Sequence, residues 1–246
     1  MKRFSKDWGR LRLRNRLSWK EEARKRAASA AVRHLKNGFA VGLGSGNTAA
    51  YAIKEMGRKI LQEKWRILGV PTSHQALRLA VAAGIPITTL DEHPELDLTI
   101  DGADQLDKDL NLIKGMGGAL TREKIVASTT KEFVIVADQT KLVEKLGKNQ
   151  PIPVEVLPFA LPTVMLKIQE MGGKPILREG KGKVGPVVTD NGNLLADANF
   201  GLIDSPRELN LRLKSIPGVI ETGLFIGMAD TAYVGTPTGV EKFEIK

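Results

Sequence analysis

From Phe39 onward, the chain alternates short apolar runs with longer stretches of helical periodicity. Strands that alternate with helices in this way are the sequence signature of βαβ units, whose strands lie parallel in one sheet. We therefore expect an α/β fold with an open, Rossmann-like and mostly parallel sheet. Strands are predicted at 39–44, 67–72, 85–90, 96–101 and 132–138, and helices at 47–64, 73–83 and from Ala119. A last strand at 231–237 is expected to return to this sheet.

A proline-rich segment that starts near residue 150 marks a change in this order. The following elements approximate βαββαβ, and they are expected at 153–157, 162–171, 174–179, 184–190, 193–197, 205–214 and 218–223. Such a series builds a smaller ferredoxin-like α+β domain. Asn191 and Gly192 suit a tight type I′ hairpin, in which both central residues need positive φ. The expected domains are 1–19 as a basic N-terminal extension, 20–149 with 225–246 as the Rossmann-like domain, and 150–224 as the small domain.

The charge of +9 is concentrated at the N-terminus. Residues 1–26 hold eleven Lys or Arg and three Asp or Glu, a net +8, so the remaining 220 residues carry about +1. A solvated leader is the favoured interpretation of the basic segment, with a polyanion-binding arm or a transit peptide as alternatives. No nucleic-acid partner is expected for the nearly neutral body.

Several classes of protein are disfavoured by composition. There is no cysteine, which excludes disulfides, thiolate nucleophiles and Cys-based zinc sites. Only three histidines are present, which leaves few ligands for a metal cluster. The sequence contains no apolar run of eighteen residues and no secretory signal, so no membrane association is expected and the protein is predicted to be cytoplasmic. These features favour metal-free chemistry by carboxylates and lysines.

The segment VGLGSGNT spans the junction between the first predicted strand and the helix after it. The N–H groups and the dipole of a helix start attract anions, and the segment offers further donors for one small phosphate, at Ser45, Gly46, Asn47 and Thr48. The spacing does not fit G-x-G-x-x-G, and the lysine of a P-loop is missing. An ordinary capped turn is the alternative. The same capping role is favoured for Thr72 and Ser73, and His74 is expected to be exposed.

Two carboxylates, Asp101 and Asp104, follow a strand and flank Gly102 and Ala103. In an open α/β sheet, ligands bind beyond the carboxyl ends of the strands. Two neighbouring acids push their pKa values apart, which can leave one of them protonated as a donor. The alternatives are a turn that satisfies its own backbone and a divalent-metal site with further acids downstream.

A lysine and several glycines precede the next helix, in Lys114, Gly115, Met116 and Gly117. The backbone of such a flexible loop can approach a ligand closely. Glu123 lies about one turn into the helix and could point into a cleft, or it could be an exposed partner in helical ion pairs. Lys141 follows the strand at 132–138, at the same edge of the sheet, although alone it would be read as a surface lysine.

Taken together, these motifs resemble ribose-5-phosphate isomerases of the A type. The resemblance covers roughly residues 20–240 and rests on GLGSGNTA, PTS, DGAD, IKGMGGALTREKIVA, ADQTKLV and PVEVLPFA, in that order. It implies interconversion of D-ribose 5-phosphate and D-ribulose 5-phosphate through an enediolate, a step of the non-oxidative pentose phosphate pathway. No metal or nucleotide cofactor is implied, and a homodimer or homotetramer is expected.

The resemblance also implies residue roles. Glu123 would be the general base, Lys114 would stabilise the enediolate, and Asp101 and Asp104 would handle hydroxyl protons. The implied substrate-binding residues are Ser45, Gly46, Asn47, Thr48, Gly102, Ala103, Gly115, Met116, Gly117 and Lys141. Asn47, Gln105 and Met116 depart from the usual family residues. The family often presents a lysine from its first helix, and Arg24 or Lys25 could correspond.

Two other functions remain open at this point. A non-catalytic sugar-phosphate sensor could use the same sheet, with the basic arm contacting DNA, although such a sensor needs no acid at position 123. A nucleotide-dependent oxidoreductase is disfavoured by the misfit of the Gly-rich loop and by the lack of a clear acid for a ribose.

Overall fold

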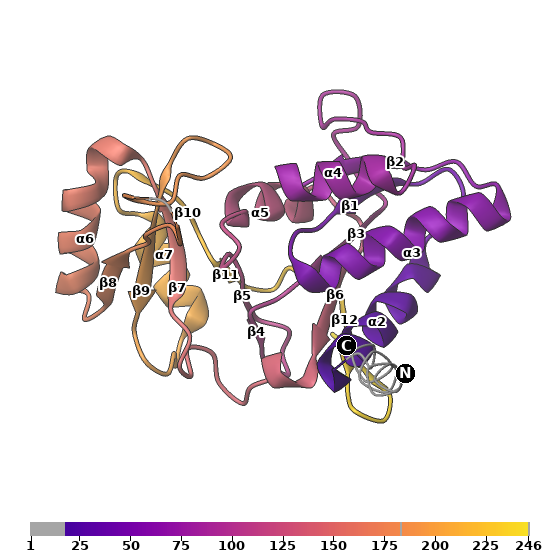
Figure 1. The fold of residues 1–246 in the computed structure, drawn as a ribbon. Coiled ribbons are helices and arrows are strands. Elements are labelled where there is room, and N and C mark those ends of the chain that lie inside the picture. The colour runs from indigo at the N-terminus through magenta and orange to yellow at the C-terminus, as the bar shows by residue number, and fades with distance from the viewer. Residues whose placement is uncertain (1–17, 183, 246) are drawn as a thin grey trace, which may run out of the picture.

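The computed structural model describes residues 18–182 and 184–245, so most of the predicted basic extension lies outside it. Two lobes are joined by short central strands (Figure 1). The large lobe contains a six-stranded sheet, and the small lobe contains a four-stranded sheet. This arrangement confirms an α/β fold with a mostly parallel sheet and a smaller antiparallel unit. The domain boundaries at 150 and 224 remain predictions.

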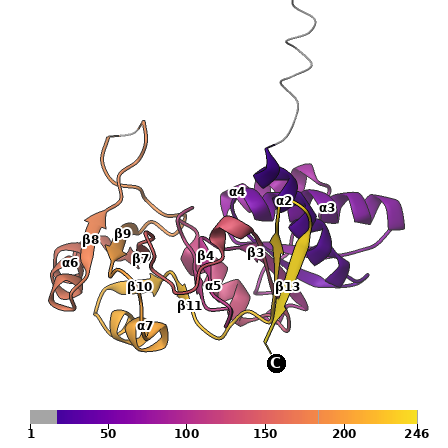
Figure 2. The ribbon, with the colours of Figure 1, turned by 90° about the horizontal axis from the view of Figure 1, so that it is seen from below.

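The sheet of the large lobe has the strand order β13-β12-β6-β3-β1-β2. Its members are β1 (Ala40–Leu43), β2 (Leu68–Pro71), β3 (Leu98–Gly102), β6 (Phe133–Asp138), β12 (Thr231–Gly235) and β13 (Val240–Glu244). All neighbours are parallel except β12 and β13. The return of the chain through β12 was predicted, whereas the edge strand β13 was not. In Figure 2, β13 runs beside α2.

The predicted strand at 85–90 is wrong, because only Ile87 forms a bridge, to Gly69 of β2. The N–H of Gly69 donates to the carbonyl of Pro86, and the N–H of Thr88 donates to the carbonyl of Gly69. The pairing does not extend further, since proline has no N–H to donate to a ladder. β2 itself ends at a proline, Pro71.

Helices cover both faces of the large sheet. α2 (Trp19–Ala31), α3 (Asn47–Glu63) and α4 (His74–Ala82) pack in one apolar core, and α5 (Leu120–Ser128) contributes to cores that contain side chains from the opposite face. β6 shows the cause, because alternate side chains of a strand point to opposite faces. Val134 and Val136 belong to the core of α2 to α4, whereas Phe133, Ile135 and Ala137 belong to the second core.

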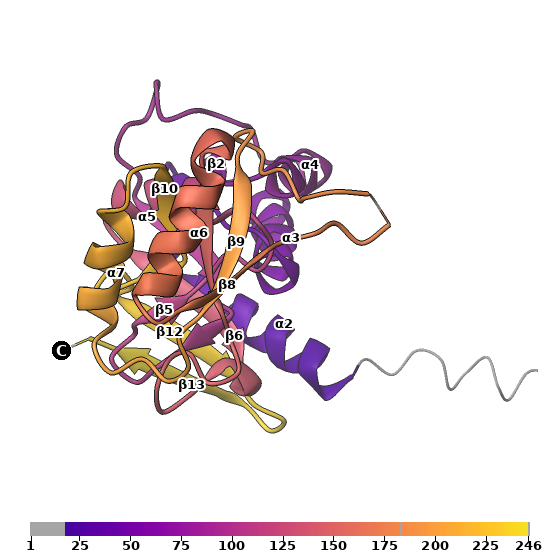
Figure 3. The ribbon, with the colours of Figure 1, turned by 90° about the vertical axis from the view of Figure 1, so that its left-hand side faces the viewer.

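The small lobe has the strand order β10-β7-β9-β8, with every pair antiparallel. Its elements are β7 (Ile152–Val156), α6 (Leu161–Glu170), β8 (Lys174–Leu177), β9 (Leu194–Asn199), α7 (Pro206–Lys214) and β10 (Val219–Thr222). The two helices lie side by side (Figure 3), and together with the sheet they enclose one apolar core. The βαββαβ series and its strand order confirm the ferredoxin-like prediction.

Two details of the small lobe were predicted wrongly. Residues 184–190 form only isolated bridges, because Pro186 interrupts any ladder there. Gly192 has a φ of 82°, but Asn191 is not among the residues with positive φ, so the turn is not type I′. The hydroxyl of Thr189 instead accepts hydrogen bonds from the N–H groups of Asn191 and Asn193, which sets the shape of the turn.

A three-stranded sheet connects the lobes, with the order β11-β5-β4. Its strands are β4 (Gln105–Leu106), β5 (Leu112–Ile113) and β11 (Leu224–Phe225), and short 3₁₀ turns occur at η2 (Val32–His34), η3 (Gln139–Lys141) and η4 (Pro158–Ala160). β5 leads directly into Lys114, whose N–H donates to the carbonyl of Gly223 at 2.8 Å. Within 18–182 and 184–245, no helix has the length and apolar character needed to cross a membrane.

Candidate active site

The loop between β1 and α3 packs tightly against the end of β3. A Cβ at Gly44 would lie 2.2 Å from Asp101 Oδ1, so only glycine allows this approach. The N–H of Ser45 donates to the same Oδ1 at 3.0 Å. Gly46 precedes α3 with a φ of 94°, and no side chain caps the helix there. The first N–H groups of α3 therefore lack intrahelical partners, as expected for an anion site.

A buried cluster of three charged side chains lies beside this loop. Lys114 Nζ is 2.9 Å from Asp101 Oδ2 and 3.2 Å from Glu123 Oε2, and it donates a hydrogen bond of 2.6 Å to the carbonyl of Gly102. Lys114 is 2% exposed, Asp101 is 0% exposed and Glu123 is 5% exposed. The interpretation of Glu123 as an exposed helical ion-pair partner is therefore wrong. β3, β5 and α5 each bring one member of the cluster.

Burial perturbs the pKa values of all three groups. Burial, followed by the neighbouring charge of Asp101, raises the pKa of Glu123 to about 8, against the opposing effect of Lys114. Burial also raises the pKa of Asp101 above its ordinary value. For Lys114, burial acts to lower the pKa, but the charges of Asp101 and Glu123 outweigh it and the pKa is raised. The lysine thus stays cationic, while Glu123 exchanges its proton near neutral pH.

The loop after Lys114 is held from both lobes. Asp104 Oδ2 accepts a hydrogen bond from the N–H of Met116 at 2.9 Å. From the small lobe, Arg178 Nη1 donates to the carbonyls of Gly115 and Met116, both at 3.0 Å. Arg178 is fixed in turn by an ion pair with Asp197 of β9. The backbone of this loop is therefore oriented by a residue 62 positions away in the chain.

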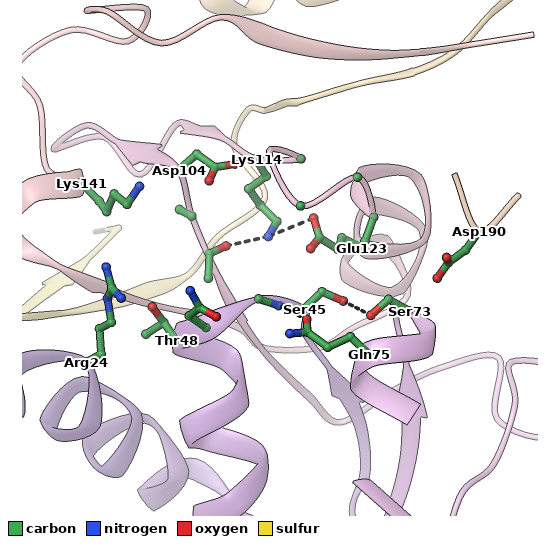
Figure 4. A pocket seen from close by; sticks show the side chains of 18 residues that line it. Arg24, Ser45, Thr48, Ser73, Gln75, Asp104, Lys114, Glu123, Lys141 and Asp190 are labelled. Carbon is green, nitrogen blue, oxygen red and sulfur yellow. Dashed lines mark hydrogen bonds and ion pairs between the residues drawn. The ribbon is translucent and has the colours of Figure 1, made fainter. Parts of the chain in front are cut away.

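A cavity of about 280 Å³ opens between these elements. Its lining residues are Arg24, Ser45, Gly46, Asn47, Thr48, Ser73, Gln75, Gly102, Ala103, Asp104, Lys114, Gly115, Gly117, Gly118, Ala119, Glu123, Lys141 and Asp190. Figure 4 shows Arg24 and Lys141 at one end, Lys114 and Glu123 in the middle, and Asp190 beyond Glu123. The described structure thus brings the predicted strand-end motifs together in one place.

The two predicted site residues that do not line the cavity, among those that the structure describes, are Asp101 and Met116. Asp101 lies behind Lys114, and Met116 is 41% exposed. At the cationic end, Arg24 Nε contacts Asp138 Oδ2 at 2.8 Å and lines the cavity. The ammonium of Lys25 lies 5.5 Å from the ring centroid of Tyr51 instead. Arg24 is therefore the residue of this pair that reaches the site.

The sequence interpretation missed several lining residues. Ser73 caps α4 as predicted, by accepting from the N–H of Ala76, but its hydroxyl also accepts from Ser45 Oγ and it lines the cavity. Gln75 Oε1 accepts from the N–H of Gly46 at 2.8 Å. Asp190 comes from the small lobe, and no sequence signal connects it to the site. His74 is exposed, as expected.

The downstream acids that a metal site would need are directed elsewhere. Asp107 accepts hydrogen bonds from the N–H groups of Asp109 and Asn111 and from the side-chain amide of Asn111. Over the described ranges 18–182 and 184–245, no group of three or more His, Cys, Asp or Glu side chains is placed to hold a metal ion. Asp107 and Asp109 thus belong to a local turn.

Comparisons with known proteins agree with this geometry. Residues 68–239 match the family model of ribose 5-phosphate isomerase A (phosphoriboisomerase A). A ribose-5-phosphate isomerase A of Methanosarcina acetivorans is 53% identical over 219 residues, which are 89% of this chain and 92% of the relative. One from Methanothermobacter thermautotrophicus is 49% identical, over 89% of this chain and 96% of the relative.

Solved structures show the same similarity. A D-ribose-5-phosphate isomerase in complex with phospho-erythronic acid superimposes with a TM-score of 0.90 at 44% identity, covering 92% of this chain and 99% of the other. Ribose 5-phosphate isomerase A of Methanocaldococcus jannaschii gives a TM-score of 0.88 at 45% identity, with the same coverage. Fold, site geometry and sequence similarity thus agree, and the chain belongs to the ribose-5-phosphate isomerase A family.

Proposed function

We propose that this protein interconverts D-ribose 5-phosphate and D-ribulose 5-phosphate by proton transfer through an enediolate. The observation that carries the proposal is the buried carboxylate of Glu123, which lines the cavity and lies 3.2 Å from the buried ammonium of Lys114. A base with a pKa near neutrality beside a fixed cation is what an enediolate mechanism requires. The family membership and the solved relative bound to phospho-erythronic acid support this assignment.

Glu123 moves the carbon-bound proton in the proposed mechanism. Its carboxylate takes the proton from C2 of the open-chain aldose, and the resulting carboxylic acid returns it to C1. Negative charge develops on oxygen between these two steps, and the ammonium of Lys114 stabilises it more strongly than it stabilises the neutral carbonyl. Because its pKa is raised to about 8, Glu123 can both accept the proton and release it near neutral pH.

The two aspartates have different surroundings, which supports different roles. Asp104 lines the cavity, and we assign to it the hydroxyl protons of ring opening and of the O1 and O2 exchange. Asp101 is fully buried against Lys114, so we assign it as a positioning residue that holds the ammonium and raises the pKa of Glu123.

Activity should survive exhaustive EDTA treatment. A loss that Mg²⁺ restores would favour a metal site at these aspartates instead.

The phosphate of the substrate is assigned to the end of the cavity that Arg24 and Lys141 line (Figure 4). The start of α3 offers N–H groups and the side chains of Asn47 and Thr48, while Arg24 and Lys141 supply positive charge. Asn47 replaces the usual serine and still provides a donor. Anchoring the phosphate there fixes which carbon meets Glu123.

A coupled isomerase assay with ribose 5-phosphate tests the proposal directly. Full-length protein and a protein that begins at Trp19 should both turn over, because the basic extension lies before α2. Glu123→Gln should lose most turnover while retaining affinity for sugar phosphates, and Glu63→Gln, an exposed residue at the end of α3, serves as the matched control. Unchanged turnover in Glu123→Gln would remove Glu123 from the base role.

We also propose a homodimer or homotetramer that works in the cytoplasm, where phosphorylated sugars are made and consumed. Phe159 is 94% exposed on the small lobe and Leu157 is 44% exposed, which is consistent with an apolar contact between copies. Light scattering across a range of protein concentrations measures the assembly, and a constant monomer mass would contradict it.

A further inference from the structure

The cavity is charged asymmetrically along its length. Arg24 and Lys141 lie at one end, and the carboxylate of Asp190 lies at the other, beyond Glu123 (Figure 4). Asp190 belongs to the turn before β9, so the small lobe supplies the only carboxylate at this end among the lining residues that the structure describes. The charge of Asp190 is not used in the proposed mechanism.

The carboxylate of Asp190 is exposed and lies at the start of α4. Its Oδ2 accepts a hydrogen bond of 2.9 Å from the N–H of His74, the first residue of α4. A helix start attracts anions because its N–H groups lack intrahelical partners and the helix dipole is positive there. The carboxylate from the other lobe therefore takes the position at α4 that a second phosphate of a ligand could occupy.

The turn that carries Asp190 is fixed in place. Glu155 of β7 is fully buried and accepts hydrogen bonds from Thr189 Oγ1 at 2.9 Å and from Asn193 Nδ2 at 2.8 Å. On the other side, Arg122 Nη2 donates to the backbone carbonyl of Asp190 at 2.7 Å. Arg122 thus binds the turn through the carbonyl of Asp190 and a neighbouring side-chain amide, whereas the side chain of Asp190 lines the cavity. The backbone of Asp190 is therefore held from two sides, and its carboxylate is held by the N–H of His74.

We propose that Asp190 is a specificity residue that restricts the cavity to sugars with a phosphate at one end only, and that excludes sugar bisphosphates. The orientation rests on the proposed function. With the 5-phosphate between Arg24 and Lys141 and C2 at Glu123, C1 points toward Asp190. A phosphate on C1 carries between one and two negative charges, and it would lie beside the carboxylate of Asp190, which already accepts from the N–H of His74.

The test compares ribitol 5-phosphate with ribitol 1,5-bisphosphate, which differ only in the second phosphate. Calorimetric titration of the full-length protein should give tighter binding of the monophosphate. Asp190→Asn removes the charge but keeps an oxygen that accepts from the N–H of His74. We expect it to reduce the Kd of the bisphosphate divided by the Kd of the monophosphate about fivefold at low salt, which is about 1 kcal/mol. Most of this change should come from tighter binding of the bisphosphate. The effect should shrink in 0.5 M salt.

Asp190→Lys is a second variant and should shift the ratio further in the same direction. Asp91→Asn, an exposed carboxylate away from the cavity lining, is the matched control and should leave the ratio unchanged. An unchanged ratio in Asp190→Asn, or equal weakening of both ligands, would overturn the assignment. Ribitol phosphates have no carbonyl and do not turn over. Failure of the isomerase assay therefore removes the proposed function, while the Kd ratio decides the role of Asp190 separately.

Discussion

Replacing Glu123 with glutamine should make the folded protein less sensitive to alkaline pH. The substitution keeps the size of the side chain and removes one ionisable group from the buried cluster. In the folded protein the pKa of Glu123 is raised from its ordinary 4.5 to about 8. The folded state therefore holds this proton more tightly than the unfolded chain does. The stabilisation is fully present below pH 4.5 and is lost as the pH rises through 8.

The magnitude follows from the pKa values. Between pH 6 and pH 8 the unfolded chain has already lost the proton while the folded protein still largely holds it, so each pH unit lowers the unfolding free energy by up to about 1.4 kcal/mol. Wild type should thus lose about 2 to 3 kcal/mol of unfolding free energy between pH 6 and pH 9 that Glu123→Gln does not lose. Protonated glutamic acid and glutamine are both uncharged, so the two proteins should be most alike at the lower pH.

Urea unfolding at pH 6 and pH 9, at equal protein concentration, measures this difference, with Glu63→Gln as the control. Parallel changes in wild type and Glu123→Gln would refute the raised pKa.

The same ionisation governs activity in our mechanism. Wild-type kcat/KM should therefore rise about tenfold from pH 7 to pH 9 and then level off, since the ionised fraction of a group with this pKa rises tenfold over that range.

Three further substitutions separate chemistry, binding and positioning. Lys114→Ala should lower kcat about 100-fold or more and raise KM less, because the cation acts on the enediolate, and the reverse pattern in steady-state kinetics would make it a binding residue only. Lys141→Ala should raise KM about tenfold with a smaller change in kcat, and an unchanged KM would place the phosphate elsewhere. Arg178→Gln should lower kcat about tenfold when assayed well below its Tm, because the carbonyls of Gly115 and Met116 lose their donor. A fall in Tm with an unaltered kcat would make Arg178 structural only.

Much of the fold could be predicted because it follows from local periodicity. The alternation of apolar runs and helices gave the parallel sheet, and the proline-rich segment near residue 150 preceded the βαββαβ series. Where these predictions failed, at 85–90 and 184–190, a proline lies within the predicted strand and prevents continuous pairing. The strand-end motifs were also local, since each lies within one loop after a strand.

The sequence by itself determined which side chains reach the carboxyl edge of the large sheet. It did not determine their ionisation. Glu123 has a pKa of about 8 because β3, β5 and α5 enclose it with Asp101 and Lys114, and burial of this kind depends on contacts between distant segments.

The small lobe's contribution was likewise decided only by tertiary structure. Arg178 and Asp190 lie in a segment with no catalytic pattern, yet one orients the loop after Lys114 and the other lines the cavity. Sequence periodicity reports which face of an element is buried, but it does not report how two lobes pack together. The electrostatics of this site arise from that packing, because they depend on distances between charges that the chain order leaves open.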